Sequence, residues 1–187
     1  MAAVWWAYEL AESLLADLLP RRWAHSRGVA VRAETLAPVL GGEAETLWAA
    51  AVLHDIGYSP AVAETGFHPL DGARHLRAIP GVDQRIVRLV ANHSFALLEA
   101  EERGLRETLE AEFPLLDDHL LVDALVYCDM TTTPDGAVTT SYARVEEILR
   151  RYGADSVVGR FIGRAAPAIH GSVERVQAQA AKAGISP

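Results

Sequence analysis

The segment that decides the fold is LWAAAVLHDIG, residues 47–57. Seven apolar residues lead directly into His54 and Asp55, which therefore stand at the end of a predicted buried helix. A charged side chain without a partner is strongly destabilising in a protein interior, or its pKa shifts until it becomes neutral. A metal ion would supply a partner for both side chains. The segment therefore predicts a helical core that ends at a metal site.

Helical periodicity extends along the rest of the chain, because apolar residues recur at spacings of three and four and no alternating strand pattern is evident. Proline and glycine mark ends of the helices, with Pro20 after the first and Gly41-Gly42 after the second. The fold class predicted is all-α, a helical bundle with a metal site in the helix core. We expect helices over residues 4–19, 22–40, 43–54, 69–79, 83–93, 117–129, 141–152 and 155–182, and one or two exposed helices over residues 97–113.

The composition argues against several classes of protein and kinds of site. The 187 residues are half apolar and carry a net charge of −8, which argues against a general nucleic-acid binder with a basic face. Cys128 is the only cysteine, so a disulfide framework and a cysteine-based zinc site are excluded, and a cytoplasmic location is expected. The sequence contains no uncharged run of about 18 residues, so no membrane-spanning helix is predicted. The aromatic first helix and the long last helix are compatible with a homo-oligomer.

Metal-competent side chains occupy positions that the helical period assigns to the interior. Each lies on an apolar face of its own predicted helix. One such residue would be ordinary, but four on separate helices indicate convergence on a single site. The four are His25, His54, His93 and Asp129.

The order of these residues resembles a known family. The strings RWAHS at residues 22–26, LHDIG at 53–57 and DMT at 129–131 together resemble the HD-domain superfamily of metal-dependent phosphohydrolases. The resemblance covers about residues 20–150 of a single expected domain, 1–187, and leaves an N-terminal helix and a C-terminal helical extension outside. His68 and His93 complete the order His, His-Asp, His, His, Asp, which resembles the dinuclear branch of that superfamily.

The resemblance implies two divalent metals, and imidazole and carboxylate ligands favour Fe or Mn, with Zn, Ni, Co and Mg as alternatives. A hydroxide bridging the metals would attack phosphorus, which assigns Asp55 to catalysis as the bridging ligand. Carried over by position, the ligands are His25, His54 and Asp129 for one metal, His68 and His93 for the other, and Asp55 between them.

An anionic substrate also needs cationic side chains, and arginine can hold phosphate with paired hydrogen bonds. His75, on roughly the same helix face as His68, is a candidate catalytic proton donor or substrate contact. The charged run at residues 99–102 is interpreted as a solvated face, and for each arginine taken singly a surface position is the favoured interpretation. The candidate substrate-binding residues are Arg22, Arg74, Arg77 and Arg144.

Three functions stay open at this point. The main hypothesis is hydrolysis of a small phosphorylated or nucleotide-like substrate, a phosphomonoester or phosphodiester, because hydrolysis dominates the resembled superfamily. A di-iron oxygenase of the same superfamily would use an identical ligand order. The third hypothesis is a non-catalytic nucleotide sensor that keeps the fold, and the intact ligand set argues against it.

Overall fold

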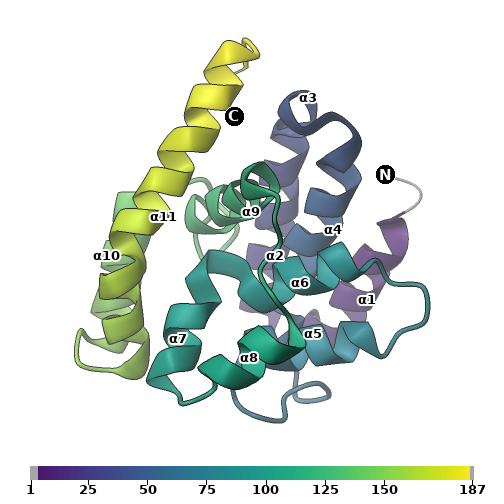
Figure 1. Ribbon diagram of the computed structural model, residues 1–187, viewed down its shortest axis with the longest axis vertical. Helices are drawn as coiled ribbons and strands as arrows, with labels where there is room; N and C mark the ends of the chain where they lie inside the picture. Colours follow the sequence, from purple (N-terminus) through teal and green to yellow (C-terminus); the bar gives the residue numbers. More distant parts are fainter. Residues whose placement is uncertain (1–3, 186–187) are drawn as a thin grey trace.

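The computed structural model describes residues 4–185 and folds them into a bundle of α-helices (Figure 1). Within these residues an isolated bridge between Thr132 and Val138 is the only β-type pairing, so the predicted all-α class is confirmed. The helices are α1 (Trp5–Leu15), α2 (Pro20–Thr35), α3 (Ala37–Leu40), α4 (Ala44–Leu53), α5 (His68–Arg77), α6 (Gln84–Asn92), α7 (Ala96–Glu102), α8 (Arg106–Glu112), α9 (His119–Met130), α10 (Ser141–Tyr152) and α11 (Val157–Lys182).

The predicted core segment forms α4 at the centre of the bundle. Every residue from Leu47 to Leu53 is buried, and α4 packs against α1, α2, α6 and α9. The three alanines at 49–51 let neighbouring helices approach closely, because the distance between packed helices depends on the side chains at the contact. The end of α4 therefore lies where several helices meet.

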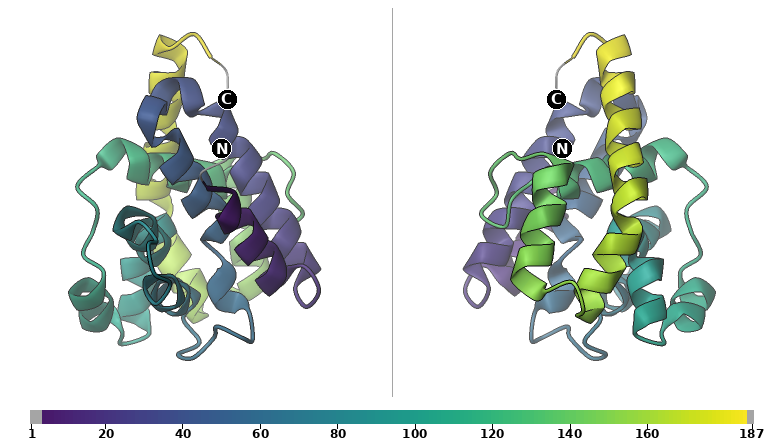
Figure 2. Two further views of the ribbon diagram at one scale, coloured as in Figure 1. Left: turned by 90° about the vertical axis from the view of Figure 1, so that its right-hand side faces the viewer. Right: turned by 90° about the vertical axis from the view of Figure 1, so that its left-hand side faces the viewer.

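The last two helices form a second layer. Figure 2 shows α10 and α11 side by side, and α11 packs along α9 and α7. A separate hydrophobic cluster joins this layer to the bundle, and it includes Met130, Ile148, Phe161 and Ile162. The layer therefore closes the side of the bundle on which α9 ends.

One predicted helix is divided, and the segment predicted as one or two helices forms two. The predicted helix over 22–40 breaks at Leu36, because Pro38 has no N–H to continue the hydrogen-bond ladder and lies instead in the first turn of α3. The predicted segment 97–113 forms α7 and α8, separated at Gly104, whose φ of +71° suits glycine.

In residues 4–185, no helix by itself has the length and apolarity to cross a membrane. The bent pair formed by Pro20–Thr35 and Ala37–Tyr58 does meet the test of length and composition when taken together.

Candidate metal centre

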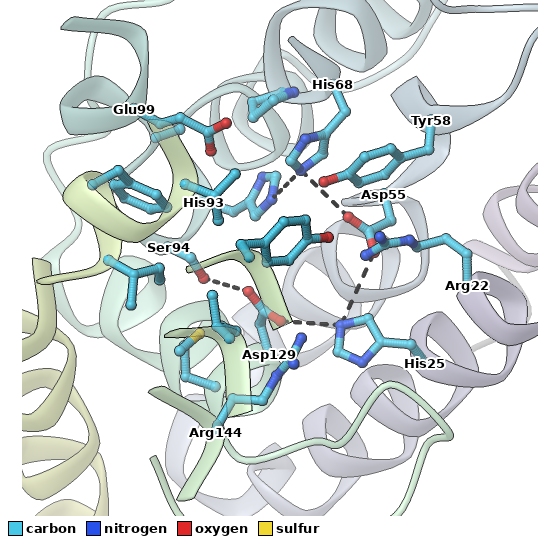
Figure 3. A pocket seen from close by; sticks show the side chains of 18 of the residues that line it. Arg22, His25, Asp55, Tyr58, His68, His93, Ser94, Glu99, Asp129 and Arg144 are labelled. Carbon is cyan, nitrogen blue, oxygen red and sulfur yellow. Dashed lines mark hydrogen bonds and ion pairs between the residues drawn. The ribbon is translucent and has the colours of Figure 1, made fainter. Parts of the chain in front are cut away.

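The structure brings the six predicted ligands together from distant stretches of the chain. Figure 3 labels all of them except His54. The end of α4 supplies two adjacent ligands, and α5 and α9 supply one each from opposite ends of their helices. All are buried except the half-buried His68. The ligands and their elements are His25 on α2, His54 and Asp55 at the end of α4, His68 at the start of α5, His93 directly after α6, and Asp129 on α9.

One half of the cluster gathers two imidazoles and two carboxylates. His25 Nε2 lies 3.1 Å from Asp129 Oδ1 and 4.0 Å from Asp55 Oδ2. His54 Nε2 lies 3.4 Å from the same Asp55 oxygen and 4.0 Å from Asp129 Oδ1. These four side chains therefore point their ligand atoms at one small volume.

Asp55 connects this half to a second one. Its other oxygen, Oδ1, lies 3.4 Å from His68 Nε2, and that nitrogen lies 3.1 Å from His93 Nε2. The groups His25–His54–Asp55 and Asp55–His68–His93 each keep their ligand atoms within 4.8 Å of one another. Asp55 thus turns one oxygen to each group, as a carboxylate that bridges two cations would.

The ring nitrogens are oriented for metal binding. In three histidines Nδ1 faces a backbone carbonyl, which can only accept, so Nδ1 donates and the lone pair lies on Nε2. A ring that binds metal through one nitrogen commonly donates from the other in this way. The pairs are His25 with Thr133 O at 3.0 Å, His54 with Ala51 O at 2.7 Å and His93 with Val90 O at 2.7 Å.

One of these Nε2 nitrogens has no hydrogen-bond partner among the described residues. It is the buried Nε2 of His54, whereas His93 Nε2 lies 3.1 Å from His68 Nε2. An unpartnered polar atom in the interior is destabilising, and a cation at this place would satisfy it. The residues present therefore fit divalent metal ions.

The charge state of the site also fits cations. Burial acts to raise the pKa of Asp55, but Arg22 and His54 hold it well below its usual range. Burial lowers the pKa of His68 and of His93, so both rings stay neutral. Burial likewise acts to lower the pKa of His54, but Asp55 outweighs it and raises that pKa to about 9. The carboxylates of Asp55 and Asp129 therefore favour positive charge beside His54, which a metal ion on Nε2 would supply in place of a proton.

Ser94 supports the site and was not predicted from the sequence. Its hydroxyl donates to Asp129 Oδ2, the oxygen that does not face His25. Ser94 and Phe95 both adopt positive φ values, +48° and +64°, which are strained for residues other than glycine. The backbone between α6 and α7 is thus bent into the conformation that places this hydroxyl on the ligand.

We expect Ser94→Ala to weaken metal binding by about 10–100-fold, because the lost hydrogen bond orients a ligand. Ser94→Gly should weaken it equally, although it relieves the backbone strain. Metal titration by calorimetry measures both constants. Ser156→Ala, which removes the hydroxyl that caps α11, is the control and should leave metal affinity unchanged. Unaltered affinity in both Ser94 variants would contradict a positioning role.

A pocket opens onto the cluster, with a cavity of about 90 Å³. Two of the predicted substrate-binding arginines line it. Arg22 Nη1 donates to Asp55 Oδ2 at 2.8 Å, and its guanidinium lies 3.9 Å from the centre of the Tyr58 ring. Arg144 is buried, and its Nε has no hydrogen-bond partner among the described residues. Both guanidinium groups are therefore held at the edge of the metal centre.

Three other predicted residues do not line this pocket: Arg74, Arg77 and His75. Both arginines pair with Glu112 of α8 instead. A helix advances 1.5 Å per residue, so these positions lie about 9 to 14 Å along α5 from His68. Because His68 is the first residue of α5, the later residues of this helix lie away from the metal centre.

Glu99 corrects the interpretation of the run at 99–102 as a solvated face. It is 6 % exposed and lines the pocket. The sequence offers no signal for this burial, because it depends on the bend at Ser94 and Phe95 that sets the direction of α7.

The sequence model of the HD domain family matches residues 22–123, which is more than half of the chain. No curated protein and no solved structure matches the chain. The matched range contains five of the six clustered ligands, and Asp129 follows it. The His-Asp pair at the end of α4, with further histidines around it, fits the metal site of that family. The chain belongs to the HD domain family.

Proposed function

We propose that this protein is a metal-dependent phosphohydrolase that uses two divalent metals and acts on a small phosphorylated or nucleotide-like substrate. The observation that carries the proposal is Asp55, whose two oxygens face two separate histidine groups. Residues of both groups line one pocket, His25 from the first and His68 and His93 from the second, so a ligand in that pocket would reach both.

The donor set fits hard or borderline divalent ions, with Fe or Mn favoured and Zn, Ni, Co or Mg as alternatives. Metals of this kind lower the pKa of water to about 7 and offset charge on phosphoryl oxygens. The residues that would hold the first are His25, His54 and Asp129; those that would hold the second are His68 and His93, with Asp55 shared.

Arg22 and Arg144 supply the groups that would bind the phosphate. A guanidinium group binds phosphate oxygens through N–H bonds in a fixed planar geometry. Arg22 is fixed by Asp55 and by stacking on Tyr58. The buried Nε of Arg144 has no partner within residues 4–185, and a phosphate oxygen in the pocket would provide one.

Counting metals in the purified protein tests the proposal. We expect about two metals per chain by elemental analysis, and turnover of phosphoesters in the presence of Mn or Fe. His93→Ala should leave about one metal, because the ligands of the other group are intact. The matched control is His119→Ala, an exposed histidine at the start of α9, which should keep both metals.

A protein that retains no metal under any loading condition would contradict the proposal. Oxygen uptake with a phosphonate or polyol, without phosphoester hydrolysis, would instead assign the oxygenase alternative. Tight nucleotide binding without turnover across several metals would assign the sensor alternative.

A further inference from the structure

Helix α7 places a carboxylate, Glu99, in the wall of the metal pocket, and Figure 3 shows it directed into the pocket. Arg103, one turn later, donates from Nε at 2.9 Å and from Nη2 at 2.7 Å to the same oxygen, Oε1. No described residue, Arg103 included, donates to Oε2. That oxygen is therefore available to a ligand in the pocket.

Glu99 differs from every other acidic residue that lines this pocket. The remaining two are Asp55 and Asp129, which belong to the metal centre. Arg22 and Arg144 cannot act as acids near neutral pH, because guanidinium groups stay protonated. Burial raises the pKa of the Glu99 carboxyl, and the hydrogen bonds from Arg103 oppose part of that rise. A carboxyl with a raised pKa is suited to donate a proton.

The surroundings of Glu99 fit the organic part of a substrate. The pocket wall that comes from α11 is apolar, with Val158, Phe161 and Ile162 among its residues. Helix α10 adds the apolar Ile148 beside the cationic Arg144 and Arg151. In phosphoryl transfer, the attacking and leaving oxygens lie roughly in line on opposite sides of phosphorus. With the attacking water at the metal centre, the leaving oxygen and its organic group must face a different wall of the pocket.

We propose that Glu99 is the general acid that protonates the leaving oxygen; this inference rests on the proposed phosphohydrolase function. The water oxygen forms a bond to phosphorus, while the bond between phosphorus and the leaving oxygen breaks. The electron pair of that bond stays on the leaving oxygen, which takes the proton from Glu99 Oε2 and departs as an alcohol. The Glu99 carboxylate then recovers a proton from the product phosphate.

A pair of substrates that differ in their leaving group tests this role. 4-Nitrophenyl phosphate releases a stable phenolate without a proton, whereas 4-nitrobenzyl phosphate releases an alkoxide that needs one. For Glu99→Gln we expect kcat/KM to fall about 100-fold for the nitrobenzyl ester and less than about threefold for the nitrophenyl ester. Metal content and melting temperature should match those of the wild type. Glu99→Asp should restore part of the nitrobenzyl activity.

The control is Glu101→Gln on the same helix, since Glu101 is exposed and pairs with Arg106 and Arg164. It should leave both rates unchanged. Equal losses on both substrates, no loss on either, or loss of metal from Glu99→Gln would overturn the assignment to acid catalysis. A metal-loaded wild type that hydrolyses neither ester would refute the phosphohydrolase proposal itself, and the role of Glu99 would fall with it.

Discussion

Asp55→Asn is expected to abolish binding of at least one metal and to lower phosphoester hydrolysis by about 1,000-fold or more. The substitution preserves shape but removes the negative charge that faces both histidine groups, one on each oxygen. Metal-assisted charge stabilisation is worth several kcal/mol, and each 1.36 kcal/mol is a tenfold change in rate. Elemental analysis and steady-state kinetics measure the two effects, and circular dichroism should show that helicity is retained.

Asp123→Asn provides the matched control. Asp123 is also a buried carboxylate, but it accepts hydrogen bonds from Ser172 and Arg175, away from the metal centre. Its substitution should lower the melting temperature and leave the metal count at two per chain. Full activity and an unchanged metal count in Asp55→Asn would refute the bridging role.

Gly57→Ala is expected to destabilise the protein by about 3 kcal/mol or more and to weaken binding of the second metal. A Cβ at this position would lie 2.0 Å from the carbonyl oxygen of His68 and 2.8 Å from the backbone nitrogen of Gly72. The start of α5 would have to move, and His68 would move with it. Overpacking costs about 1–3 kcal/mol and sometimes more. The melting temperature should fall by about 6–12 °C.

Gly163→Ala is the corresponding control, because a Cβ there meets nothing within 4 Å in the middle of α11. Alanine in an open helical position should raise stability by about 0.4–1 kcal/mol. Differential scanning calorimetry with and without chelator separates the packing effect from the metal effect. Equal melting temperatures for the two variants would contradict the close approach of Gly57 to α5.

The sequence predicts which residues gather at the candidate metal centre because four of the six interrupt an apolar helix face, where a polar residue needs a partner. His25 and Asp129 are recognisable in this way although they are 104 residues apart along the chain. The helix limits are also close, since proline, glycine and polar caps act locally. Ser141 to Tyr152, for example, is predicted to the residue.

Other features depend on contacts that no local pattern encodes. Arg74 has the cationic guanidinium group that phosphate binding requires, but in the structure this group donates to Glu112 of α8. Ser94 and Glu99 reach the pocket because Ser94 and Phe95 both adopt positive φ. Neither residue with positive φ is a glycine, so the sequence does not indicate the bend. The sequence therefore predicts what must be buried and paired, and it leaves open which partner each long side chain meets.

The residues around the pocket come from two parts of the chain. Five of the six ligands lie within residues 22–123, whereas the apolar wall formed by Ile148, Phe161 and Ile162 comes from the two helices that follow. Substitutions in these helices can enlarge or narrow the wall while every ligand stays in place. Selectivity can therefore diverge independently of the chemistry, and chains with the same HD core and different terminal helices can accept different leaving groups.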